Sequence, residues 1–119
     1  LSLDPPLMLA ALDRGSRTLA AVEAAGCFGI NVLHDGQEEV ARGFSTKVPH
    51  PEKWREVAWE ERNGIPALAG ALVWVACELD EVVAGGDHVI LTGAVLGVQV
   101  RAGDPLVFWE GRYRPLAEN

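Results

Sequence analysis

A histidine beside an acidic residue, directly after two glycines, is the part of this sequence best suited to chemistry. Gly85-Gly86-Asp87-His88 leads into the apolar run Val89-Ile90-Leu91, which predicts His88 at the mouth of a buried strand. Two glycines permit a tight turn and close backbone approach to a ligand. Histidine, with an ordinary pKa of about 6.5, can donate or hold a proton during proton or hydride transfer. Taken alone, however, the motif is more typical of an ordinary hairpin turn.

A second set of polar residues is suited to binding an anion. Ser16, Arg17 and Thr18 stand at the start of a predicted helix over 17–25, which Gly26 ends. Free amides and the dipole at a helix start favour a phosphate. The end of the preceding strand could offer backbone groups to the same ligand, from Ala11, Leu12 and Asp13. The residues alone favour a simpler interpretation, in which Ser16 only caps the helix and Arg17 is a solvated charge.

The elements that would position these groups are mainly strands. Apolar runs and alternation predict strands over residues 7–12, 28–33, 71–83, 88–100 and 105–109. Short Gly/Asp turns join the later strands, which predicts an antiparallel meander that closes most economically as a barrel.

A second helix is expected between the early and the late strands. Asp35 and Glu38 have the spacing of a capping box, with Asp35 as the cap, and predict a short helix to about Gly43. Residues 44–69 are expected to be irregular because proline and glycine interrupt their periodicity, apart from one helical turn opened by Pro51.

Length and charge narrow the classes of function. A chain of 119 residues is predicted to form one domain with a real core. The net charge of −7 argues against a nucleic-acid partner, because such binding depends on neutralising phosphates with Lys and Arg. No apolar run reaches the ~20 residues of a membrane span, and no positively charged leader is visible. We therefore expect a cytoplasmic protein with no membrane partner.

Several common site types are not expected. Cys27 and Cys77 lack the spacing of a zinc or haem site and are predicted to be small buried residues rather than a disulfide. The three histidines, His34, His50 and His88, are separated and lack supporting ligands, so no metal site is expected. No Gly-x-Gly-x-x-Gly opens a helix after a strand, so no dedicated dinucleotide fold is expected either.

A set of short motifs spans nearly the whole chain. In order, the chain carries Leu1-Ser2-Leu3-Asp4-Pro5-Pro6-Leu7, Asp13-Arg14-Gly15-Ser16-Arg17-Thr18, Gly26-Cys27-Phe28-Gly29-Ile30-Asn31-Val32-Leu33, Gln37 with Phe44-Ser45, Lys53-Trp54, Trp59, Gly64-Ile65-Pro66, Cys77-Glu78, Gly85-Gly86-Asp87-His88 and Pro105-Leu106-Val107-Phe108-Trp109-Glu110-Gly111-Arg112-Tyr113. This set closely resembles the flavin reductase family with the FMN-binding split-barrel fold, which includes the reductase components of two-component flavin monooxygenases.

The resemblance implies a fold, a site and an activity. The fold would be mainly β, an antiparallel split β-barrel with a few short helices. The implied flavin contacts are Ala11, Leu12, Asp13, Ser16, Arg17, Thr18, Gly43 and Phe44. The implied contacts to the nicotinamide dinucleotide are His88, Phe108, Trp109, Glu110 and Gly111, with His88 as the catalytic residue. Trp54, Trp59 and Trp74 are interpreted as packing residues outside the site.

This sequence departs from the family pattern in two places. Related sequences often carry a basic residue immediately before the aromatic residue, whereas Gly43 separates Arg42 from Phe44 here. They also carry a Gly-x-Thr-x-Ser-Ser-Phe type segment, with two strands, before Ser-Leu-x-Pro-Pro. We therefore expect residues 1–119 to be one flavin reductase-like domain that lacks its N-terminal strands, and the native protein to extend upstream of Leu1.

The implied function is the reduction of FMN or FAD by NADH or NADPH in a homodimer, with reduced flavin passed to a separate monooxygenase. Two alternatives remain at this point. One is an electron-transfer protein that keeps its flavin, and the other is a related barrel that binds flavin or haem for sensing without turnover. The motif at His88 favours the reductase.

Overall fold

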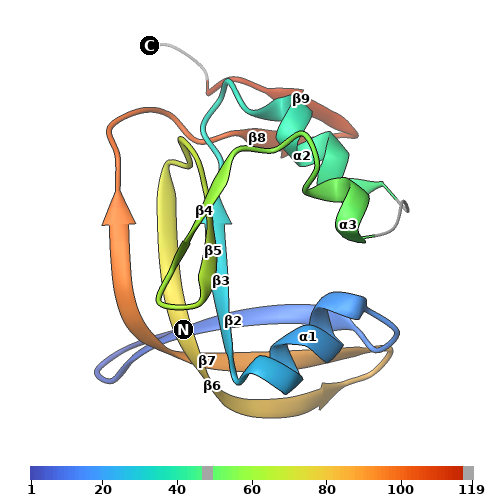
Figure 1. Cartoon of the computed structure of the whole chain (residues 1–119), viewed down its shortest axis with the longest axis vertical. Coiled ribbons are helices and arrows are strands. Elements are labelled where there is room, and N and C mark those ends of the chain that lie inside the picture. Colours follow the sequence, from blue (N-terminus) through green and yellow to red (C-terminus); the bar gives the residue numbers. More distant parts are fainter. Residues whose placement is uncertain (47–49, 117–119) are drawn as a thin grey trace. The chain divides into compact units, whose positions relative to one another are not determined.

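The computed structural model describes residues 1–46 and 50–116, which form nine strands and three helices (Figure 1). The elements are β1 (Ser2–Leu3), β2 (Pro6–Asp13), α1 (Arg17–Ala25), β3 (Cys27–Val32), α2 (Glu38–Ser45), α3 (His50–Lys53), β4 (Trp59–Arg62), β5 (Ile65–Leu68), β6 (Val73–Gly85), β7 (His88–Val100), β8 (Val107–Trp109) and β9 (Arg112–Arg114). They form two compact units. Unit 1 is Leu1–Ile30 with Val75–Val98, and unit 2 is Asn31–Trp74 with the chain from Gln99 onward.

Unit 1 is built around a sheet with the strand order β1-β2-β7-β6-β3. β2 pairs antiparallel with β7 in a register that runs from Leu7 opposite Ala94 to Asp13 opposite His88. The long β6–β7 hairpin turns at Gly86, where φ is +72°, and the sequence correctly placed this turn. The predicted meander is wrong in one respect, because β7 pairs with β2 instead of with the strand that follows it.

Helix α1 forms as its sequence predicts. The Ser16 hydroxyl accepts a hydrogen bond from the Leu19 amide at 3.3 Å, and Gly26 ends the helix in the left-handed conformation at φ +71°. Leu19 and Val22 are the buried side chains of the helix, and they belong to the core of unit 1. The bounds and both caps of this helix are therefore confirmed.

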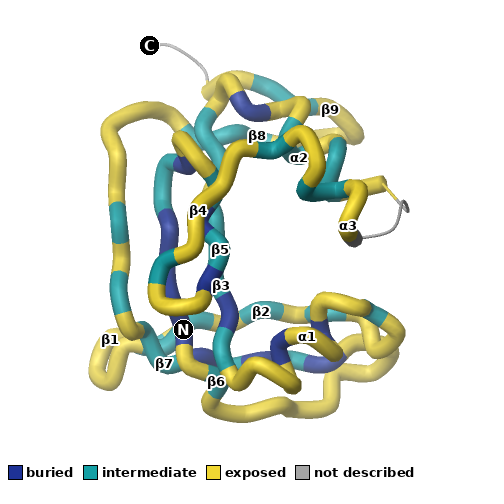
Figure 2. The backbone as a smooth tube through the Cα atoms, viewed as in Figure 1, coloured by how far each residue is buried: buried dark blue, intermediate teal, exposed yellow. Residues whose placement is uncertain are grey.

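The core of unit 1 is formed by α1 and by strands β3, β6 and β7 of the sheet (Figure 2). Its buried residues are Leu19, Val22, Phe28, Val75, Ala76, Cys77, Val89 and Leu91. Gly93 lies against this core, and a Cβ atom added there would come within 2.5 Å of Phe28 Cζ and 2.6 Å of Cys77 Cβ. Burial raises the pKa of the Cys77 thiol. Cys27 and Cys77 are both free thiols, as predicted.

Unit 2 contains two small hairpins, β4–β5 and β8–β9, with helices α2 and α3. Its buried apolar residues are Ile65, Ala67, Ala71 and Trp74. The β4–β5 hairpin turns at Asn63-Gly64, where both residues have positive φ. Asn-Gly favours this turn because both positions tolerate the left-handed region. The prediction of an irregular segment over 44–69 is thus wrong at β4 and β5. A helical turn is present as α3, but it begins at His50, one residue before the predicted Pro51. Residues 47–49 lie outside the described chain.

Helix α2 differs from its prediction at both ends. Gln37 is the N-cap residue in place of Asp35, and the helix continues through Phe44 to Ser45. The reason is a pair of hydrogen bonds: the buried Gln37 side chain accepts from His34 N at 3.0 Å and donates to Ala69 O at 3.0 Å. These bonds place the helix start two residues later than the capping-box spacing predicts.

No helix within residues 1–46 and 50–116 has the length and apolar character needed to cross a membrane.

Candidate functional site

Unit 1 brings the end of β2, the start of α1 and the β6–β7 turn together. Asp13 pairs with His88 across the sheet. The neighbouring Arg14 bonds to the turn twice, from Nε to Gly86 O at 2.8 Å and from its amide to Asp87 O at 3.3 Å. The predicted catalytic residue and the predicted flavin residues of this unit therefore lie next to one another, joined by Arg14, which is not among the predicted site residues.

His88 is held by the residue before it. His88 Nδ1 lies 2.7 Å from Asp87 Oδ1, and the two side chains are 47% and 94% exposed. The hydrogen bond and the charge of His88 lower the pKa of the Asp87 carboxyl. A lowered pKa keeps Asp87 ionised, so the pairing persists until the pH falls through that value. With Nδ1 facing the carboxylate, Nε2 is the ring nitrogen left for a ligand.

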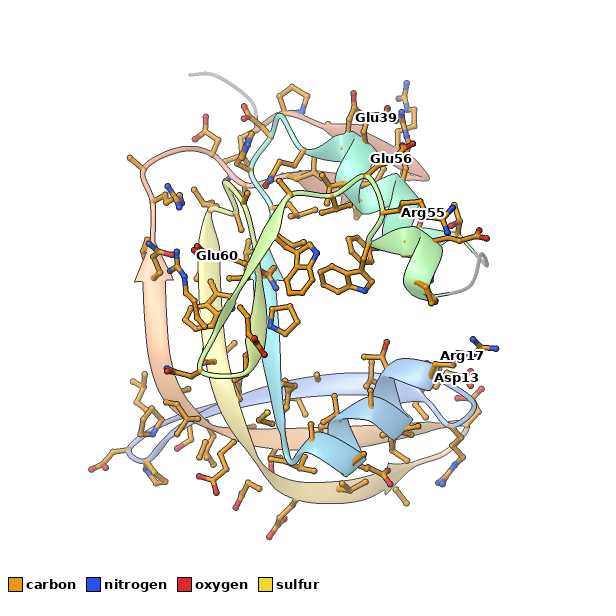
Figure 3. The ribbon with its side chains drawn as sticks, viewed as in Figure 1. Asp13, Arg17, Glu39, Arg55, Glu56 and Glu60 are labelled. Atoms are coloured by element: carbon orange, nitrogen blue, oxygen red, sulfur yellow. The ribbon has the colours of Figure 1, made fainter. Side chains whose placement is uncertain are left out.

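The start of α1 offers backbone amides more than side chains. The first intrahelical bond runs from Ala20 N to Ser16 O, so the amides of Arg17 and Thr18 precede the hydrogen-bonded turns. Asp13 accepts from Gly15 N at 2.8 Å through its carboxylate and from Ser16 N at 3.0 Å through its carbonyl. Figure 3 shows Asp13 and Arg17 at this end of the unit. Ser16 does cap the helix, as its simpler interpretation requires, and Arg17 is exposed.

In unit 2, Phe44 belongs to an aromatic cluster. Its ring meets Trp54 edge-on at 4.9 Å between centroids, and Trp54 meets Trp59 in the same way at 5.4 Å. Lys53 Nζ donates a hydrogen bond to Phe44 O at 3.1 Å and so satisfies a backbone carbonyl in the last turn of α2. Trp54 therefore packs on a predicted flavin contact, while Trp59 contacts Trp54 and is itself 48% exposed. Aromatic residues separated by ten or more positions carry no sequence signal of such contact.

The β8–β9 hairpin carries the predicted dinucleotide residues of unit 2. Phe108 and Trp109 are 60% and 62% exposed on β8, and the turn is made by Glu110 and Gly111 at φ +50° and +77°. Phe108 lies directly opposite Tyr113, and their ring centroids are 5.0 Å apart. Tyr113 is therefore a neighbour of this predicted site that is not itself among the predicted site residues.

Arg42 is engaged within its own unit. Its guanidinium bonds Glu39 at 2.9 Å, lies 3.5 Å from Glu38, and sits over the Tyr113 ring at 5.5 Å from the centroid. Because the two carboxylates already neutralise the positive charge of Arg42, this residue is poorly suited to binding a phosphate. They also join α2, which carries Gly43 and Phe44, to the β8–β9 hairpin.

The predicted site residues thus form two groups, each within one unit. Unit 1 holds Ala11, Leu12, Asp13, Ser16, Arg17, Thr18 and His88. Unit 2 holds Gly43, Phe44, Phe108, Trp109, Glu110 and Gly111. Within the described residues, no three His, Cys, Asp or Glu side chains are placed to hold a metal ion. The role of each residue in binding or catalysis remains a prediction.

Comparison with known proteins covers nearly the whole chain. Residues 1–117 match the family described as flavin reductase like domain. The reductase subunit HsaB of a flavin-dependent monooxygenase from Rhodococcus jostii (strain RHA1) is 37% identical over 115 residues, which are 95% of this chain and 58% of that protein. An NADH-dependent flavin reductase from Rhodococcus sp is 36% identical over 115 residues, 97% of this chain and 64% of that protein.

A solved structure matches as well. The Streptomyces globisporus C-1027 NADH:FAD oxidoreductase SgcE6, in complex with NAD and FAD fragments, matches with a TM-score of 0.92 and 31% identity, over 98% of this chain and 72% of that one. The chain spans less than two thirds of the length of the two Rhodococcus proteins. Matches to flavin reductase structures confirm the predicted fold class and the resemblance read from the motifs.

Proposed function

Because the chain belongs to the flavin reductase-like domain family, we propose that the protein reduces FMN or FAD with NADH or NADPH and supplies the reduced flavin to a separate monooxygenase. The observation that carries the proposal is the family match over residues 1–117, which includes every predicted site residue. Two similar proteins are NADH-dependent flavin reductases by name, which favours NADH as the donor. A third similar protein is, by name, the reductase subunit of a flavin-dependent monooxygenase, which favours an oxygenase as the partner.

The residues of unit 1 fit a phosphate-bearing flavin. The amides of Arg17 and Thr18 at the start of α1, with the Arg17 guanidinium, would bind the phosphate. Bound flavin would supply the redox chemistry by accepting a hydride from the nicotinamide. His88, with its Nδ1 held by Asp87, would use Nε2 to orient the dinucleotide or hold a proton.

A steady-state assay tests the proposal directly. The full-length protein should oxidise NADH or NADPH when FMN or FAD is added, and oxidation should depend on both substrates. A protein that binds flavin but oxidises neither nucleotide would instead be the electron carrier or sensor, and the proposed reductase activity would be wrong.

Replacing Arg17 should separate the phosphate contact from other flavin contacts. We expect Arg17→Ala to weaken FMN binding about tenfold, the effect of losing one exposed charge-assisted hydrogen bond, and to leave riboflavin binding nearly unchanged. Fluorescence titration with both ligands measures this difference. Arg101→Ala removes another exposed arginine and serves as the control. Equal losses for FMN and riboflavin would remove Arg17 from the phosphate site.

We also propose that the protein is a homodimer. Leu96 and Val98 on β7 are 58% and 56% exposed, and alternation puts them on the sheet face opposite the buried Val89 and Leu91. Leu9, also exposed, shares their face because it pairs with Thr92. An apolar sheet face of this kind suits an obligate interface, which typically buries more than ~2,000 Å².

Light scattering at micromolar concentration tests the dimer. The wild type should have twice the protomer mass, and Leu96→Lys should shift it toward the monomer. Glu23→Lys changes a charge on the exposed part of α1 and should leave the mass unchanged. A monomeric wild type would contradict the proposal.

A further inference from the structure

Phe108 and Trp109 are adjacent on β8 and therefore point to opposite faces of the β8–β9 hairpin. Their cross-strand partners confirm the alternation: Phe108 lies opposite Tyr113, and Trp109 lies opposite Arg112. The Phe108 and Tyr113 rings touch edge-on, at 5.0 Å and 60°, so they share one face. One ligand lying flat on either face of this two-stranded hairpin would contact one of the two exposed aromatic rings, not both.

The Phe108 face is the one joined to α2. The Arg42 guanidinium lies over the Tyr113 ring at 5.5 Å, while Glu39 and Glu38 hold the guanidinium on the helix. A continuous set of contacts therefore runs from α2 through Arg42 and Tyr113 to Phe108. All of these residues lie in unit 2.

We infer that Tyr113 is a positioning residue that holds Phe108 on the α2 side of the hairpin, and that Phe108 rather than Trp109 contacts the nicotinamide dinucleotide. This inference rests on the proposed reductase function. Helix α2 carries the predicted flavin contacts Gly43 and Phe44, and the dinucleotide must stack against the flavin to transfer a hydride. The aromatic ring on the face joined to α2 is therefore the one suited to the dinucleotide.

The exposure of Phe108 explains why a positioning residue is needed. At 60% exposure, its ring has few packing partners, and Tyr113 is the aromatic ring in contact with it among the described residues. Tyr113 is itself half-buried and has Arg42 over its ring. Removing the Tyr113 ring would free the Phe108 side chain to turn, which costs orientation of the dinucleotide without touching the flavin contacts.

The first experiment compares the two aromatic residues of β8 in the full-length protein. Phe108→Ala should raise the KM for NADH about tenfold, and Trp109→Ala should raise it by less than about threefold, because a stacked ring contributes a contact that an opposite-facing ring does not. The flavin Kd and the melting temperature of both variants show whether the fold is intact. An equal or larger effect of Trp109→Ala would overturn the assignment of Phe108.

The second experiment tests Tyr113 with a matched pair of variants. Tyr113→Leu removes the ring and should raise the KM for NADH roughly 2- to 12-fold, the range for a lost aromatic pair, with the flavin Kd unchanged. Tyr113→Phe keeps the ring over which Arg42 lies and should restore the wild-type KM. A purely structural role would lower stability and flavin binding together with turnover.

The outcomes separate this inference from the function on which it rests. A wild type that oxidises no nucleotide with added flavin would overturn both. An active wild type in which Tyr113→Leu behaves like Tyr113→Phe would overturn the positioning role alone. If Tyr113→Leu does not fold, the comparison of Phe108→Ala with Trp109→Ala still decides which ring contacts the dinucleotide.

Discussion

Replacing His88 with alanine should lower NAD(P)H oxidation by about 10- to 10⁴-fold, the range for losing orientation or general acid–base help. The flavin Kd should change little, because the amides at the start of α1 and the side chain of Arg17 remain. The reason is geometric: Asp87 holds His88 Nδ1 at 2.7 Å, and the pair lies beside Asp13 at the end of β2. Stopped-flow measurement of flavin reduction, with flavin titration on the same samples, checks both parts.

A graded control strengthens this test. Asp87→Asn keeps an oxygen that can accept from Nδ1 but loses the charge, so its rate should fall between those of the wild type and His88→Ala. Full activity in a stable His88→Ala variant would show that this histidine takes no part in the reaction. Parallel loss of melting temperature, flavin binding and turnover would mean that His88 only supports the hairpin.

Replacing Gly93 with alanine should destabilise the protein by about 3 kcal/mol, the upper end of the range for overpacking a core. The new Cβ would lie 2.5 Å from Phe28 Cζ and 2.6 Å from Cys77 Cβ. The Phe28 ring can turn to some extent, but a Cβ atom such as that of Cys77 moves only with its backbone. Thermal and denaturant unfolding of the variant measure the loss.

Gly97 on the same strand provides the matched control. A Cβ atom added there would meet nothing within 4 Å. Gly97→Ala should therefore leave stability unchanged or raise it slightly, because alanine reduces the entropy of the unfolded chain. Similar melting temperatures for the two variants would show that the close contact at Gly93 is relieved by small shifts of the core.

Elements whose signals are local could be predicted closely. α1 has its cap, its apolar spacing and its terminal glycine within eleven consecutive residues, and its bounds match the prediction. The β6–β7 hairpin is similarly defined by alternation and by its Gly-Gly-Asp turn, and β7 begins at His88 as expected. In these segments, the contacts that decide the structure lie close together in the sequence.

Elements decided by distant contacts could not be predicted in the same way. The start of α2 depends on Gln37 bonding to Ala69, 32 residues away. The pairing of β2 with β7 joins residues about 80 positions apart, and nothing local to β7 distinguishes β2 from β8 as its neighbour. The β4–β5 hairpin is a different case, since Asn63-Gly64 is a recognised turn signal that the interrupting prolines obscured.

In the candidate site, too, features with local signals could be predicted and features that depend on distant contacts could not. Residue types and the family resemblance predict His88 and the start of α1 as site residues, and the sheet register brings them together in unit 1. The contacts of Arg42 with Tyr113, and of Phe44 with Trp54, depend on side-chain packing between separate elements. Sequence alone gave no reason to prefer Phe108 over Trp109, whereas the hairpin register separates them.

The burial of Cys77 has a consequence for the resistance of the protein to oxidation. Reduced flavin reacts with oxygen to give hydrogen peroxide, so the proposed function would place this protein beside an oxidant of thiols. Peroxide attacks the thiolate form, and burial both raises the pKa of the Cys77 thiol and hides the sulfur from solvent. Cys27, which is only half-buried, is consequently the thiol of this chain that oxidation would reach first.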